Sequence, residues 1–155
     1  MADWISRAEW ETIVQNVPIP SVDLVVECPD GVVLAERTNR PAKGEWFVPG
    51  SRVHKGERLV EAVHRVAETE LGVSVTIEED LGTFEHFYSH SEVGERKHYI
   101  AHGYRVWTEA VEFETDEQHN CIRVFEEFTT GLHKYVRSYI KNVEFDGLNF
   151  SESNT

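Results

Sequence analysis

One amphipathic helix between two glycines constrains this chain more than any other feature of its sequence. From Arg58 to Leu71, apolar residues recur at the three- and four-residue spacing of a helix with one buried face. They are Leu59, Ala62, Val63, Val66, Ala67 and Leu71. Gly72 follows, in the position where glycine commonly ends a helix, and Pro49-Gly50 precedes the polar loop before it. The sequence therefore predicts a strand, a loop, a helix and a turn in succession.

The other predicted elements are short strands and two more helices. A helix is expected from Ser6 to about Asn16, opened by the capping-box spacing of Ser6 and Glu9 and ended by Pro18 and Pro20. The predicted strands are 22–27, 32–35, 46–48, 73–77, 81–88, 97–107 and 122–125, with a turn at 29–31 and a loop at 39–45. A last helix is expected over 129–142. This order favours an α/β or α+β fold with a mixed β-sheet sandwiched between helices.

Length and hydropathy favour one compact domain over residues 1–150, followed by a polar tail, 151–155, that we expect to be disordered. No apolar run is long enough to span a membrane, and the first ten residues do not resemble a secretory signal. Cys28 and Cys121 lie far apart in the sequence, which favours two free thiols in a reducing compartment. We therefore expect a cytoplasmic protein.

The formal net charge of −13 restricts the partners of this chain. Such a field repels nucleic acid and anionic membranes, so neither is expected as a partner. Strong acidity with few lysines also suits a halophilic protein, because concentrated salt screens the self-repulsion. An anionic substrate would have to be met by a metal ion and a few arginines gathered at one site.

The stretch from Gly50 to Val73 resembles the Nudix box, the pattern G-x5-E-x7-R-E-U-x-E-E-x-G-U in which U is aliphatic. The matching residues are Glu57, Arg65, Glu70, Gly72 and Val73. The resemblance implies a Nudix fold, whose loop-helix-loop directs carboxylates at a metal that holds a diphosphate. Oxygen ligands of this kind suit Mg²⁺, with Mn²⁺ as the other candidate.

Three positions depart from the box. Ser51 replaces a glycine, while Val66 and Thr69 replace two of the glutamates that usually gather the metal cluster. Only Glu70 remains, so one ion is expected, and fewer metals give less help to a water that attacks phosphorus. From the box alone, the domain is either a non-catalytic relic or an enzyme whose chemistry has moved to another atom.

Outside the box, three stretches are similar to the GDP-mannose mannosyl hydrolase branch of the Nudix family. They are Asp23 to Glu27, Arg37 to Gly50 and Asp116 to His119. The resemblance implies a nucleotide-sugar substrate, most plausibly GDP-mannose, and a homodimer. It also implies that water attacks the anomeric carbon with inversion and that GDP leaves.

The resemblance further implies the residues of the site. The metal would be held by the carbonyl of Gly50, the carboxylate of Glu70 and the side chain of Gln118, and His119 would be the general base. A positioned base of this kind is worth roughly 10²–10⁴-fold in rate. The remaining candidates act on the substrate. Arg37, Arg52 and Arg65 are expected to bind the phosphates, Tyr99 to donate to a phosphate oxygen, Asp23 to stabilise positive charge on the sugar or to hold its hydroxyls, and His86 to bind substrate.

Plainer explanations compete with these roles. Glu57 and Arg65 commonly pair in Nudix domains to brace the loop on the helix. Two other functions stay open as well: a pyrophosphohydrolase that cleaves the P–O bond of a nucleoside diphosphate derivative, and a non-catalytic domain that only binds nucleotide sugars.

Overall fold

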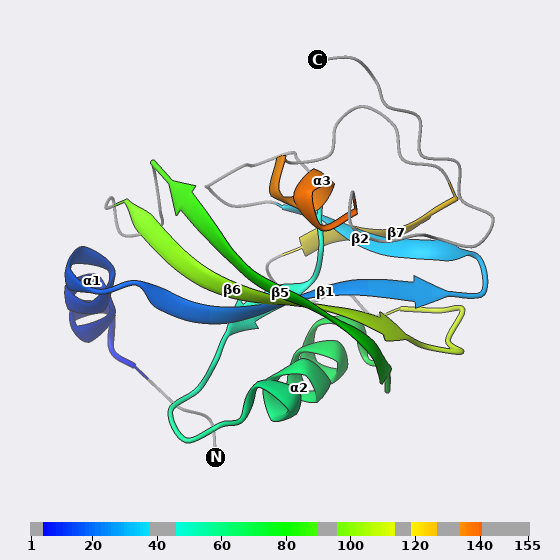
Figure 1. Cartoon of the computed structure of the whole chain (residues 1–155), viewed down its shortest axis with the longest axis horizontal. Coiled ribbons are helices and arrows are strands. Elements are labelled where there is room, and N and C mark those ends of the chain that lie inside the picture. The colour runs from blue at the N-terminus through cyan, green and yellow to red at the C-terminus, as the bar shows by residue number, and fades with distance from the viewer. Residues whose placement is uncertain (1–4, 38–45, 90–95, 114–118, 127–133, 141–155) are drawn as a thin grey trace.

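The predicted strands come together in one mixed sheet in a computed structural model that describes residues 5–37, 46–89, 96–113, 119–126 and 134–140 (Figure 1). The helices there are α1 (Arg7–Asn16), α2 (Leu59–Leu71) and α3 (Lys134–Ile140). The strands are β1 (Ile19–Cys28), β2 (Gly31–Arg37), β3 (Trp46–Phe47), β4 (Gly50–Arg52), β5 (Thr76–Tyr88), β6 (Lys97–Trp107) and β7 (His119–Phe125).

Strand β1 lies at the centre of this sheet. It pairs with β6 in parallel along one edge, and with β4 and then β2 in antiparallel fashion along the other. The path β3-β2-β1-β6-β5 is completed by β7, which pairs with β2. Both faces of β1 are covered, so Val22, Leu24, Val25 and Val26 are all fully buried.

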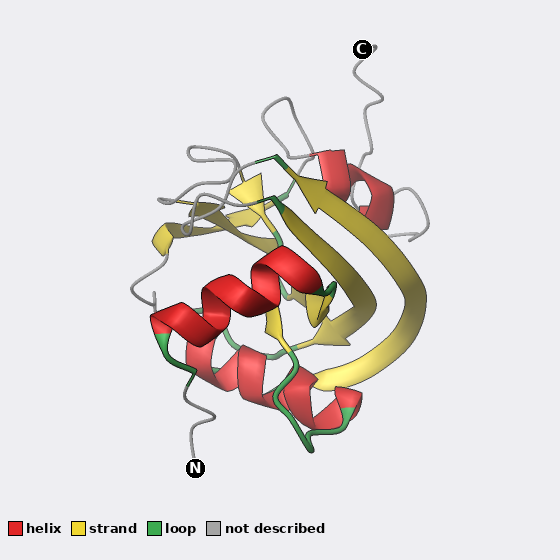
Figure 2. Cartoon of the chain, turned by 90° about the vertical axis from the view of Figure 1, so that its left-hand side faces the viewer, coloured by secondary structure: helices red, strands yellow, loops and turns green. Residues whose placement is uncertain are grey.

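Helix α2 covers one face of the sheet and α3 lies on the other (Figure 1). The α2 residues Ala62, Val63 and Val66 pack with Val22 and Leu24 of β1 in one core cluster. Val136 and Tyr139 of α3 pack with Val25 in a second cluster. This confirms the predicted sandwich. Figure 2, a view turned by 90°, shows how strongly the sheet curves around α2.

The amphipathic stripe of α2 is confirmed apart from its first residue. Leu59 is 37% exposed, whereas the other five apolar positions are buried. Gly72 ends the helix in the left-handed conformation, with φ of 67°. The opening of α1 is confirmed in its capping contact, since the hydroxyl of Ser6 accepts a hydrogen bond from the Glu9 amide at 3.2 Å.

Strand β5 corrects the prediction of two separate strands, 73–77 and 81–88. It runs unbroken through the polar residues Glu78 to Asp80, because two bulges and the positive φ of Gly82 keep it paired with β6. An edge strand also tolerates polar side chains, so this polar run between the two predicted strands belongs to one strand.

Strand β4 was not predicted, since Gly50-Ser51-Arg52 has no apolar pattern; its pairing with β1 forms it. Pro20 was expected to lie in the break after the first helix, but it belongs to β1. There its carbonyl accepts a hydrogen bond from the Val53 amide at 2.9 Å. Strand β7 is longer than predicted and begins at His119.

Several predictions fall outside the described residues: the loop 39–45, the two ends of the last helix and the tail 151–155. Within the described part of the chain, no helix is both long and apolar enough to cross a membrane.

Candidate functional site

A row of glycines surrounds Asp23 in the middle of the sheet. Strand register places Asp23 opposite Gly50 of β4 on one side and Gly103 of β6 on the other. A Cβ on Gly50 would lie 2.1 Å from Asp23 Oδ1, so only glycine leaves room for the carboxylate. A Cβ on Gly103 would lie 2.6 Å from a ring carbon of Tyr139. The two glycines therefore let a carboxylate and a phenol lie flat on the same face.

The backbone of Gly50 points away from β1. The residues on either side of β4 carry hydrogen bonds to β1: Leu24 N donates to Pro49 O at 2.8 Å, and Val53 N donates to Pro20 O at 2.9 Å. The Asp23–Gly50 pair between them is thus a non-hydrogen-bonded pair, whose amide and carbonyl groups face outward. The Gly50 amide accordingly donates to Glu70 Oε2 at 3.0 Å. Gly50 therefore lies between the two carboxylates. Asp23 Oδ1 occupies the space where a Cβ on Gly50 would be, and Glu70 accepts the hydrogen bond from the Gly50 amide.

Helix α2 contributes one buried carboxylate, that of Glu70, beside Gly50. Glu70 is only 8% exposed. Val66 is fully buried in the core, and the Thr69 hydroxyl donates back to the Arg65 carbonyl. Among the described residues, no group of three or more His, Cys, Asp or Glu side chains could hold a metal. A carboxylate and an outward carbonyl at the Gly50 edge are hard oxygen donors, the kind of ligand that Mg²⁺ takes in proteins.

The Asp23 carboxylate also belongs to a buried hydrogen-bond network. Tyr139 Oη donates to Asp23 Oδ2 at 2.6 Å, and His86 Nε2 lies 2.8 Å from the same hydroxyl. His86 Nε2 is 3.5 Å from Asp23 Oδ2. Burial, and then the charge of Asp23, raises the pKa of Tyr139 far above its usual range, so the phenol stays protonated. The structure thus brings together Asp23 and His86, two of the predicted site residues.

Further predicted residues share this face of the sheet. Ser21 pairs with Arg52, and Tyr99 pairs with both Ile19 and His86, which by alternation puts Arg52 and Tyr99 on the face of Asp23. The Trp10 ring lies near both Arg52 and Lys97, and Lys97 was not predicted to belong to the site. Lys97 Nζ lies 5.3 Å from the ring centroid of Trp10 and 5.6 Å from that of Tyr99. Arg52 Cζ lies 5.8 Å from the Trp10 centroid. In so acidic a chain, this gathers positive charge at one end of the face.

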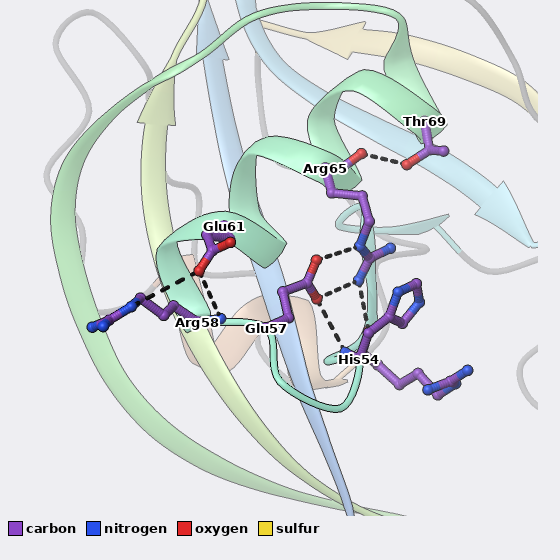
Figure 3. A network of polar contacts seen from close by, with 7 residues as sticks. His54, Glu57, Arg58, Glu61, Arg65 and Thr69 are labelled. Atoms are coloured by element: carbon purple, nitrogen blue, oxygen red, sulfur yellow. Dashed lines mark hydrogen bonds and ion pairs between the residues drawn. The ribbon is translucent and has the colours of Figure 1, made fainter. Parts of the chain in front are cut away.

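Arg65 makes the bracing contacts predicted as its plainer role (Figure 3). Its Nε and Nη2 donate to the two oxygens of Glu57 at 2.7 and 3.1 Å, and Nη2 also donates to the Arg52 carbonyl at 2.9 Å. Glu57 accepts a third bond from the His54 amide at 3.0 Å. The bond from Arg65 is the largest cause lowering the pKa of Glu57. This network ties the box loop to α2, and a phosphate contact by Arg65 stays a prediction.

Two of the remaining candidates, Arg37 and His119, lie at the end of β2 and the start of β7. Arg37 and His119 are paired residues of β2 and β7, so their backbones are neighbours. Gln118 lies outside the described residues. The proposed base and one proposed phosphate ligand are therefore adjacent in the sheet although they are 82 positions apart in the sequence, and their catalytic roles stay predictions.

Two residues of this site, Tyr139 and Lys97, were not among those predicted from the sequence. Tyr139 lies three positions after Val136 in the last predicted helix, and this helical spacing was the signal that could have found it. Lys97 was read only as the start of a strand, yet it is 6% exposed. Alternation with Tyr99 on the same strand was the signal that could have found it.

Comparison with known proteins gives a consistent result. A family model described as NUDIX domain matches residues 17–136. The chain is 53% identical over 134 residues to the low-salt glycan biosynthesis protein Agl8 of Haloferax volcanii, a match that covers 85% of this chain and 86% of that protein. A shorter match, 34% identical over 67 residues, covers 43% of this chain and 40% of an ADP-ribose pyrophosphatase of Methanocaldococcus jannaschii.

Solved structures agree in fold. The MutT protein of Methanosarcina mazei superposes with a TM-score of 0.67 at 22% identity, over 80% of this chain and 91% of that one. A MutT NUDIX hydrolase of Burkholderia pseudomallei gives a TM-score of 0.67 at 22% identity, over 82% and 98%. At this level of identity the likeness concerns the fold alone.

Proposed function

We propose that this chain, which belongs to the NUDIX family, hydrolyses a nucleotide sugar at the sugar carbon, with GDP-mannose as the leading substrate. Nudix hydrolases generally use divalent cations such as Mg²⁺ and bind nucleotide-derived substrates, so the coarse activity follows from membership. The substrate, the bond that breaks and the roles of individual residues are our proposals.

The observation that carries this proposal is the meeting of two different carboxylates at Gly50. Glu70 is the one buried acid that α2 sends to this edge, and Asp23 reaches it from the opposite face. A single ion can neutralise the charge of a leaving diphosphate, whereas in-line attack on phosphorus is commonly served by two metal ions. A separate carboxylate suits the positive charge that develops on a sugar carbon. This division of charge favours C–O cleavage.

A bound Mg²⁺, held by Glu70, the Gly50 carbonyl and Gln118, would supply positive charge to the diphosphate. In the proposed reaction, water bonds to the anomeric carbon and gives its proton to His119, while the C–O bond breaks and its electrons leave with GDP. Arg37, Arg52 and Tyr99 hold the phosphates. Asp23 faces the carbon that becomes positive, and His86 contributes to binding on the same face.

The relatives add support of two kinds. The 53% identical relative is named for glycan biosynthesis, a process built on activated sugars, which favours a nucleotide sugar. The shorter match is named an ADP-ribose pyrophosphatase, which keeps P–O cleavage as the second candidate function. We also propose a cytoplasmic homodimer that tolerates high salt.

Hydrolysis in ¹⁸O-labelled water decides between the two candidates. We expect GDP-mannose and Mg²⁺ to give GDP and mannose with the label in the sugar, and the first product to be the inverted anomer by NMR. Label in a phosphate would establish P–O cleavage instead. Absence of turnover across a panel of nucleotide sugars, with tight binding retained, would leave a binding domain.

A variant tests the base. His119→Gln is expected to slow turnover by roughly 10²–10⁴-fold while KM changes little, because a glutamine cannot accept the proton. His64→Gln, on the exposed side of α2, is the matched control and should keep full activity. Equal rates for the two variants would remove His119 from the base role.

A further inference from the structure

We propose that Tyr139 of α3 is a positioning residue, whose hydroxyl fixes the Asp23 carboxylate in the orientation that the reaction requires. The proposal rests on the proposed function, in which Asp23 stabilises the positive charge that develops on the sugar carbon. It adds a residue from α3 to a site otherwise built from the sheet and the box.

The contacts hold both oxygens of Asp23. Oδ2 accepts the bond from Tyr139 Oη at 2.6 Å, and Oδ1 lies against the backbone of Gly50, where no Cβ would fit. A carboxylate fixed at both oxygens has lost its freedom to rotate about its terminal bond. The hydroxyl of Tyr139 is therefore one half of a clamp whose other half is a glycine.

The Tyr139 ring is itself held in place. It is 1% exposed and packs edge-on against Phe84, with ring centroids 4.5 Å apart. Its edge lies over Gly103, where any larger residue would displace it. Because packing and not the hydrogen bond sets the ring position, the hydroxyl presents Asp23 with a fixed donor.

The hydrogens available on each group determine which group donates in each hydrogen bond of the network. A phenol has one hydrogen, and at 2.6 Å from a carboxylate it donates that hydrogen to Asp23. The 2.8 Å contact with His86 then requires His86 Nε2 to carry a proton and to donate to Tyr139 Oη. The order His86 to Tyr139 to Asp23 makes the Asp23 carboxylate the final acceptor of the network. Burial keeps the pKa of Tyr139 high, so this order persists at neutral pH.

The test is Tyr139→Phe, which removes the hydroxyl and keeps the ring. We expect kcat to fall by about 10- to 100-fold, since a bond to a charged group is lost, with KM within about threefold. Tyr135→Phe is the matched control on the same helix; its hydroxyl bonds the Phe87 backbone amide and carbonyl at 2.6 and 2.9 Å. It should keep kcat within about twofold. An unchanged kcat in Tyr139→Phe overturns the proposal.

A double-mutant cycle separates positioning from general stability. In the background of Asp23→Asn, Tyr139→Phe should cost little further rate, because the group it positions is gone. An equal loss in both backgrounds would mean that Tyr139 does not act through Asp23, and would overturn the proposal. Gly103→Ala changes no polar group, yet it should lower kcat in the same way by moving the ring.

A spectroscopic readout does not depend on turnover. The ¹⁵N shifts of the His86 ring should show a protonated Nε2, and Tyr139→Phe should shift that signal. A His86 signal unmoved by Tyr139→Phe overturns the proposed network, even in a chain that proves active. If the unmodified chain cleaves no nucleotide sugar, the proposed function fails, and this signal still decides the network.

Discussion

Replacing Gly50 with alanine perturbs both carboxylates of the site through one methyl group. The new Cβ would lie 2.1 Å from Asp23 Oδ1 and 2.7 Å from the Val22 carbonyl oxygen. Ordinary contact begins near 3.4 Å, so the carboxylate must move by about 1.3 Å, the difference of 3.4 and 2.1. The Val22 carbonyl cannot turn aside, because Val22 is paired with Ser51 in the sheet.

That displacement is large compared with the contacts it disturbs. A carboxylate that moves by more than 1 Å loses its 2.6 Å bond from Tyr139, a loss of about 1.5–3 kcal/mol for a bond to a charged group. Overpacking of the strand pair adds about 1–3 kcal/mol. A shift of about 1 Å in a reacting geometry also costs on the order of 10²-fold in rate. We therefore expect Gly50→Ala to be less stable by a few kcal/mol and nearly inactive.

Urea denaturation and steady-state kinetics on the same preparations measure both effects. Ser51→Ala is the control, since Ser51 is the next residue of β4 and already has a Cβ. It should unfold and turn over like the unmodified chain. If Gly50→Ala matched that control in both assays, then Asp23 does not occupy the space over Gly50, and the proposed meeting of the two carboxylates would be wrong.

Three further perturbations test other parts of the molecule. Arg65 depresses the pKa of Glu57 below its ordinary 4.5, so the stability from this pair is present above that pH and is lost as pH falls through the folded-state pKa; Glu57→Gln should flatten that part of the acid-unfolding curve, and an identical curve would contradict the brace. Glu70→Gln should raise the Mg²⁺ concentration for half-maximal activity by about tenfold or more, and an unchanged titration would remove Glu70 as a ligand. Finally, with a net charge of −13, the unfolding temperature should rise between 0.1 and 1 M KCl as the Debye length falls from about 10 to 3 Å, and a flat response in calorimetry would count against adaptation to salt.

The parts of this protein that local sequence determines were predicted well. Helix α2 follows from the spacing of its apolar residues and from Gly72, and the opening contact of α1 follows from Ser6. The turn at 29–31 was also predicted, and in the structure it connects β1 to β2, where Cys28 pairs with Gly31. Each of these rests on contacts within about four positions or on the intrinsic conformational preference of one residue, so no distant part of the chain is needed to specify it.

Only the tertiary structure determined which polar side chains lie close to one another. Nothing local to Asp23 indicates that Gly50 and Gly103 flank it, or that Tyr139, 116 positions away, bonds to it. The same holds for β4 and for the continuous β5, which exist because neighbouring strands satisfy their backbone groups. Strand register is set by packing across the whole sheet, so a site assembled from register can be seen only when the chain is folded.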